Sequence, residues 1–177
     1  MKLLNIIEIP FEKVLETYRI ENGQKNDSWE ITNLTRANKK FGSWINCEIP
    51  ITEIGKIVIP HYKYGGAIII PKEGMILSDA YDNFYKNKER FERENPQFCE
   101  RIEKQKEIIF KSKKVKVIYL SQEPLFIGDS YKNLTKFKGT ITKLDGTHRL
   151  MALIDLKEKP KSIDAFIAVY NNFLTIF

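Results

Sequence analysis

One segment near the C-terminal end, LDGTHRLMALIDL, constrains the fold most, because it joins a strand, a turn and a helix directly. Apolar and polar residues alternate over Thr140–Leu144, as is typical of a half-buried strand. Asp145 and Gly146 then form a tight turn, and a helix follows from about Thr147 to Leu156. The apolar residues on one face of this helix are Leu150, Leu153 and Ile154. The turn is therefore expected at the N-terminus of a helix.

The other patterns predict an α+β fold. Helical spacing predicts helices over Pro10–Arg19 and Ser28–Lys40, with Ser28 as an N-cap, and a helical pair or one kinked helix over residues 78–111. We expect a single domain over residues 1–177, with a β-α-β core near the C-terminus and an N-terminal α/β extension over residues 1–110. Short apolar runs bounded by turns predict strands over Leu3–Ile9, Ile45–Ile49, Lys56–Ile59, Ala67–Ile70, Val115–Leu120 and Ile163–Tyr170.

Composition narrows the class of protein. The chain has 29 Lys and Arg against 23 Asp and Glu, a net charge of +6, which either favours anionic partners or serves solubility. The wholly apolar runs, such as Ala67–Ile70, are far shorter than the roughly 18 residues of a membrane span. Glu8 and Pro10 interrupt the region where a signal peptide would continue. We therefore expect a cytoplasmic protein with no membrane partner.

Secondary candidates lie outside the strand–turn–helix segment. The two Cys and two His residues have no spacing typical of zinc ligands. His61 and Tyr62 either line a ligand pocket or pack as turn residues, and the stretch Ser121–Lys138, which includes Tyr131, is either a lid over phosphates or a polar surface loop. A run of basic residues indicates charges that protect an edge strand, or a contact to nucleic acid: Lys111, Lys113, Lys114 and Lys116.

The turn itself has the chemistry of an anion site. Unpaired backbone N–H groups and the helix dipole attract an anion, and Gly146 allows close approach. Arg149 could bind a phosphate through two hydrogen bonds, Thr147 could cap the helix or contact a phosphate oxygen, and His148 could donate or shuttle a proton. Asp145 could hold Mg²⁺, accept a proton from an attacking hydroxyl, or cap the helix. These features predict a site for an anion such as a phosphate group.

The alternative to a ligand site is a purely structural turn. Here the Asp-Gly turn and a helix cap serve only to connect the strand to the helix. His148 then packs in the interior, and Arg149 pairs with Asp155 or with a surface glutamate.

The D-G-x-H-R pattern formed by Asp145, Gly146, His148 and Arg149 resembles the signature of the ParB/sulfiredoxin-like superfamily. The resemblance covers residues 115–170 and implies a ParB/sulfiredoxin-like β-α-β core. Sulfiredoxins have a reactive cysteine immediately before the His-Arg pair, where this sequence has Thr147. ParB partition proteins continue into a helix-turn-helix domain, whereas 28 residues follow Arg149 here. The pattern is most similar to the free serine kinase-like branch.

That resemblance implies a nucleotide-dependent phosphotransferase, a kinase acting on a small hydroxyl-bearing metabolite with ATP or ADP and Mg²⁺. Asp145 would be the base or carry the metal, and residues 1–110 would help to bind the acceptor. The serine kinases also use an upstream glutamate as a base, for which Glu53 and Glu123 are the candidates. Two alternatives stay open: a non-enzymatic module that binds nucleotides or nucleic acid, and a ParB-like nuclease or an accessory to DNA modification or phage defence.

Overall fold

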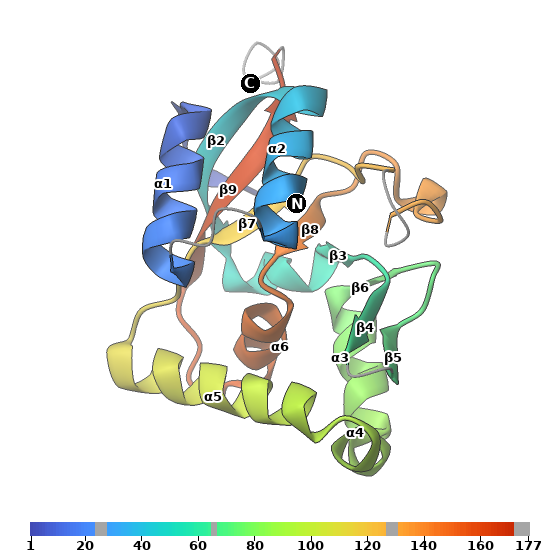
Figure 1. Ribbon diagram of the computed structural model, residues 1–177. Helices are drawn as coiled ribbons and strands as arrows, with labels where there is room; N and C mark the ends of the chain where they lie inside the picture. Colours follow the sequence, from blue (N-terminus) through green and yellow to red (C-terminus); the bar gives the residue numbers. More distant parts are fainter. Residues whose placement is uncertain (24–27, 65–66, 127–130, 172–177) are drawn as a thin grey trace.

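The computed structural model describes residues 1–23, 28–64, 67–126 and 131–171. It is built on a mixed seven-stranded sheet in the order β1-β2-β9-β7-β8-β3-β6, and β4 and β5 form a separate hairpin (Figure 1). The predicted α+β class is confirmed. The strands are β1 (Leu4–Ile9), β2 (Gly42–Pro50), β3 (Val58–Ile59), β4 (Tyr62–Tyr64), β5 (Ala67–Ile70), β6 (Met75–Ile76), β7 (Ile118–Ser121), β8 (Thr142–Asp145) and β9 (Ser162–Tyr170).

Helices cover both faces of the sheet. Successive residues of a strand point to opposite sides, so each strand contributes side chains to the core on either face. In β7, Tyr119 packs with α1 (Phe11–Asn22) and α2 (Trp29–Phe41), whereas its neighbours Ile118 and Leu120 belong to the core on the other face. The helices of that second face gather in the lower half of Figure 1. They are α3 (Leu77–Lys86), α4 (Lys88–Glu94), α5 (Pro96–Ser112) and α6 (Thr147–Asp155), and short 3₁₀ turns occupy Ile51–Lys56 and Thr135–Phe137.

The local signals in the sequence position several of these helices. The Ser28 hydroxyl accepts a hydrogen bond from the backbone N–H of Ile31 at 3.2 Å, which confirms the predicted N-cap of α2. The region over residues 78–111 forms three helices rather than a pair, with breaks at Asn87 and Asn95. Pro96 occupies the first turn of α5, where its missing N–H costs no intrahelical bond.

The elements β8, α6 and β9 follow one another as the sequence predicts. However, β8 and β9 are not neighbours in the sheet, because β7 lies between them. Since β7 pairs antiparallel with β8 and parallel with β9, the two strands that flank α6 run in opposite directions. The helix therefore joins two antiparallel strands across an intervening strand.

The basic run over residues 111–116 does not protect an edge strand, so that prediction is wrong. The strand that follows it, β7, is inside the sheet, between β9 and β8. Lys116 donates a hydrogen bond to the backbone oxygen of Glu21, and the N–H of Val117 donates to the Glu21 carboxylate at 3.1 Å. Within the described ranges, no helix has the length and apolar character needed to cross a membrane.

Candidate functional site

The site is built around the turn between β8 and α6. Gly146 has φ +111°, a conformation that L side chains rarely adopt, so glycine is required for α6 to start directly after the strand. A Cβ atom at this position would also lie 2.9 Å from Cδ1 of Ile118. The N-cap residue of α6 is Gly146, which has no side chain to accept a hydrogen bond from the first turn of the helix.

On one side of the turn, Arg149 forms a buried brace. Its Nη2 donates to Oδ2 of Asp145 at 2.6 Å, and its Nη1 donates to the backbone oxygen of Val117 at 2.7 Å. Arg149 is only 7% exposed, so both bonds are largely shielded from water. The guanidinium thus ties the end of β8 to the residue that precedes β7.

The brace gives Arg149 an acidic partner different from those that the sequence suggested. Asp155 instead accepts hydrogen bonds from Tyr81 at 2.5 Å and from Lys106 at 2.6 Å. The Asp145–Arg149 pair spans one helical turn, from the last strand residue to the first turn of α6. Tertiary packing against β7 holds the guanidinium close to Asp145.

On the other side of the turn lies a pocket of about 180 Å³, which contains Asp145, Thr147 and His148 of the predicted site. In Figure 1, the lower end of α2 reaches toward β8 above α6. The pocket draws residues from α2, from the chain after β3, and from α5, β8 and α6. Its lining residues are Trp29, Glu30, Pro60, His61, Tyr62, Arg101, Tyr131, Lys143, Leu144, Asp145, Thr147 and His148.

Lys143 is the most unusual of the lining residues. It is 8% exposed, and among the described residues its amine has no carboxylate within 4.0 Å. The amine faces the ring of Tyr62, with 5.9 Å between Nζ and the ring centroid. Burial lowers the pKa of the Lys143 amine, although the negative charge of Asp145 opposes that shift. A buried amine of this kind gains more from an anionic ligand than a solvated lysine does.

His148 lies in an aromatic environment next to Lys143. Its ring centroid is 5.1 Å from that of Phe98 and 6.0 Å from that of Tyr62. The pKa of His148 is lowered to about 4. Burial is the largest cause, and the positive charges of Arg101 and Lys143 act in the same direction. The imidazole is therefore neutral near pH 7.

The structure brings together only part of the predicted site. Asp145, Thr147 and His148 line the pocket, while Gly146 and Arg149 adjoin it without being among the described lining residues. Neither upstream glutamate is among those lining residues. Glu53 accepts hydrogen bonds from Lys56 at 2.9 and 3.0 Å, and Glu123 accepts one from Tyr170 at 2.7 Å and pairs with Lys40 at 3.2 Å.

Sequence reasoning missed four of the polar or aromatic lining residues, namely Trp29, Glu30, Arg101 and Lys143. Lys143 left no sequence signal, because a lysine in a half-buried strand is expected on the solvent-facing side, whereas the structure buries Thr142, Lys143 and Leu144. His61 and Tyr62 do line the pocket, although the Nδ1 atom of His61 also lies 2.7 Å from the backbone oxygen of Ile70. Tyr131 also lines the pocket and is buried, whereas Lys132, Lys136 and Lys138 of the same stretch are exposed.

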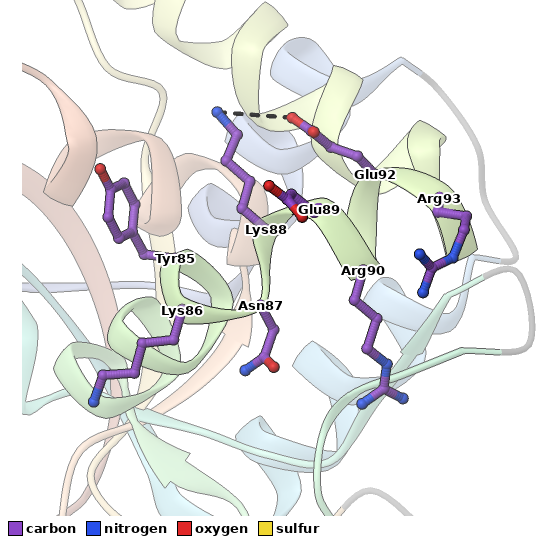
Figure 2. Close-up of a pocket in the computed structure, with 8 residues that line it drawn as sticks. All are labelled: Tyr85, Lys86, Asn87, Lys88, Glu89, Arg90, Glu92 and Arg93. Atoms are coloured by element: carbon purple, nitrogen blue, oxygen red, sulfur yellow. Dashed lines mark ion pairs between the residues drawn. The ribbon is translucent and has the colours of Figure 1, made fainter.

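A larger hollow of about 720 Å³ lies at the junction of α3 and α4, but its side chains do not converge. Figure 2 shows Lys86, Arg90 and Arg93 extending in different directions from the backbone. Lys88 pairs with Glu92 at 3.7 Å, and Arg90 pairs with Glu94 at 3.0 Å, both at exposed positions. This hollow is a solvated charged surface, and we assign it no ligand.

Within the ranges that the structure describes, no group of three or more His, Cys, Asp or Glu side chains is arranged to hold a metal ion. Two carboxylates, Glu30 and Asp145, line the pocket. Mg²⁺ in nucleotide sites is commonly held by one or two carboxylates together with phosphate oxygens and water. The pocket therefore fits a magnesium ion that arrives with phosphates better than a metal held by the protein alone.

Comparison with known proteins adds a family but no activity. Residues 1–173 match the model of a family described as "Family of unknown function (DUF6309)". No curated protein and no solved structure matches the chain.

Proposed function

The chain belongs to DUF6309, a family of unknown function, and we propose that its pocket binds the phosphate groups of a nucleotide. The observation that carries this proposal is the Lys143 amine, which is buried in the pocket without a carboxylate partner among the described residues. A buried cation is costly unless it is paired, and an anionic ligand supplies the missing partner. The start of α6 provides the second component, because its N–H groups and dipole favour an anion.

The other lining residues support the same ligand. Arg101 adds a second cation to the pocket, and Thr147 contributes a hydroxyl at the first position of α6. At about 180 Å³ the pocket is smaller than the roughly 300–1,000 Å³ of sites that enclose a drug-sized molecule. Phosphate oxygens would fill it, and the rest of the nucleotide would lie across its rim.

We propose further that the reaction is phosphoryl transfer from ATP or ADP to a small hydroxyl-bearing acceptor, as the resemblance to the serine kinase-like branch of the ParB/sulfiredoxin-like superfamily implies. Positioning and charge neutralisation supply most of the catalysis in such reactions. Oδ2 of Asp145 accepts a hydrogen bond from Arg149. In this proposal, Oδ1 would bind Mg²⁺ or take the proton from the hydroxyl group of the second substrate. Glu53 and Glu123 have no role in this proposal, because their cationic partners lie outside the pocket.

Calorimetric titration of ATP, ADP and CTP with Mg²⁺ tests the binding step. Lys143→Met keeps the volume and removes the charge, so it should weaken nucleotide binding at least about tenfold, the loss expected for one charge-assisted contact. The matched control is Lys138→Met, which removes an exposed lysine from the segment before β8 and should leave the affinity unchanged. Equal affinity in the wild type and Lys143→Met, or no binding by the wild type, would overturn the proposal.

A second candidate is a module that binds a nucleotide or nucleic acid without catalysis. The surroundings of Asp145 and His148, the two predicted catalytic groups at the turn, favour it. Arg149 holds Asp145 at 2.6 Å, and burial lowers the pKa of His148 to about 4. A general base works best when its pKa is near the operating pH. Nucleotide binding without product formation from a panel of hydroxyl acceptors, followed by ³¹P NMR, would support this candidate over the phosphotransferase. Steep salt dependence with single-stranded or duplex DNA would indicate nucleic acid instead of a free nucleotide.

A further inference from the structure

The rim of the pocket contains an exposed tryptophan that the fold does not require. The chain has two tryptophans, and Trp44 is buried at 1% exposure, stacked on Phe11 and bonded to Asn38. Trp29 is 52% exposed, although it is the first residue of α2 and lines the pocket. The core formed by α2 is made by other residues, beginning with Ile31. Trp29 therefore leaves a large apolar surface beside a polar pocket.

The surroundings of Trp29 suit a flat ring. The guanidinium of Arg36 lies 5.9 Å from the centroid of the indole, a cation–π contact that helps to orient the ring, and about half of the side chain stays exposed. Aromatic side chains stack on planar rings in offset geometry. Since the pocket is too small to enclose a nucleoside, a base attached to bound phosphates would lie at this rim.

Glu30, the next residue, adds an acceptor of the opposite charge to Lys143 and Arg101. A carboxylate accepts hydrogen bonds and repels phosphate, so it is unsuited to a pocket for inorganic phosphate alone. It suits a ligand that has hydroxyl donors as well as an anionic group. A nucleoside phosphate combines an anion, the ribose hydroxyls and a planar base.

We infer that Trp29 stacks on the base of a nucleotide and that Glu30 accepts hydrogen bonds from its ribose hydroxyls, while Lys143 binds the phosphates. This inference rests on the proposed function and names its ligand class as a nucleoside phosphate rather than a free phosphate or a phosphorylated metabolite without a ring. Trp29 and Glu30 would then set specificity, while the affinity for the phosphates would come from residues elsewhere in the pocket.

Two ligands separate this inference from the proposed function: ATP, which has a base, and inorganic tripolyphosphate, which has only the phosphates. Trp29→Ala should weaken the binding of ATP about 5- to 150-fold, the range for one base–aromatic stack. The same variant should leave the affinity for tripolyphosphate unchanged. Trp29→Phe keeps an aromatic ring and should recover part of the ATP affinity. Lys143→Met should weaken the binding of both ligands.

Fluorescence gives a second measurement that does not depend on deleting Trp29. In the Trp44→Phe variant, Trp29 is the remaining tryptophan, so its emission reports directly on the rim. ATP should quench this emission, and tripolyphosphate should not. Equal ATP affinity in the wild type and Trp29→Ala, with Lys143→Met still impaired, would overturn the role of Trp29 and leave the phosphate site standing. Failure of the wild type to bind either ligand would overturn both proposals.

Discussion

The two sides of the β8–α6 turn differ in how a buried positive charge is compensated. On one side, the Arg149 guanidinium is buried with two partners, the Asp145 carboxylate at 2.6 Å and the Val117 carbonyl at 2.7 Å. On the other side, the Lys143 amine is buried with no carboxylate within 4.0 Å among the described residues. A paired cation contributes to a fixed structure, whereas an unpaired one costs stability and attracts a ligand.

This contrast changes the meaning of the D-G-x-H-R pattern in this chain. Arg149, the residue whose type best suits a phosphate, is engaged by the protein itself. Lys143, which precedes the pattern, lines the pocket together with Arg101. The turn thus has one side that is bonded within the protein and one side that lines a pocket, and variants can test the two sides separately.

The largest expected effect is the loss of the brace. Arg149→Ala leaves the Asp145 carboxylate and the Val117 carbonyl without their donor, and should lower the free energy of unfolding by about 4 kcal/mol. Urea denaturation measures this change. The control is Arg90→Ala, which breaks an exposed pair with Glu94 and should cost less than about 1 kcal/mol. Equal losses in the two variants would contradict a buried brace.

The next effect is a pH dependence that originates at His148. Its folded-state pKa of about 4 lies below the unfolded value of 6.5, so the unfolded chain binds more protons between these values. The contribution of the neutral ring to stability is therefore complete above pH 6.5 and is lost as the pH falls through 4, a change of about 3 kcal/mol. Measuring the free energy of unfolding of the wild type and of His148→Gln at pH 7 and pH 4 isolates the contribution of His148. Parallel pH profiles would show that burial does not lower this pKa.

A smaller effect is expected at the turn itself. Gly146→Ala should cost about 2 kcal/mol, because alanine is strained at φ +111° and its Cβ would approach Ile118. Gly139→Ala is the matched control: it has φ +73° and open space around its Cβ, so only the backbone strain of about 1 kcal/mol applies. Thermal or urea unfolding measures both. A larger loss at Gly139 than at Gly146 would contradict the tight contact at the turn.

The smallest expected effect has the opposite sign. Lys143→Met removes a buried amine that has no carboxylate within 4.0 Å among the described residues, and should raise the free energy of unfolding by about 1 kcal/mol, in the direction seen when buried charges are replaced by apolar groups. Because burial lowers the pKa of Lys143, the unfolded chain binds the extra proton below pH 10.5, and the wild type should approach the variant in stability as the pH rises. Denaturation from pH 7 to 10 measures this. Loss of stability in Lys143→Met would indicate that the amine is already paired.

Much of the local structure could be predicted from the sequence. The Ser28 cap, the strand before Asp145 and the start of a helix at Thr147 depend on residues that are close in the chain. Their signals are short-range hydrogen bonds, side-chain periodicity and the φ preference of glycine. The division of residues 78–111 into three helices was missed, since neither Asn87 nor Asn95 is an obligatory helix breaker.

The sequence by itself determined that a turn at Asp145 and Gly146 leads directly into a helix, because backbone preferences act within a few residues. Only the tertiary structure decided which charges of that turn are satisfied. Val117, the partner of Arg149, is 32 positions away, and Trp29 and Arg101 reach the pocket from separate helices. Burial and pairing depend on which segments the sheet order brings together, and those long-range contacts leave no local pattern in the chain.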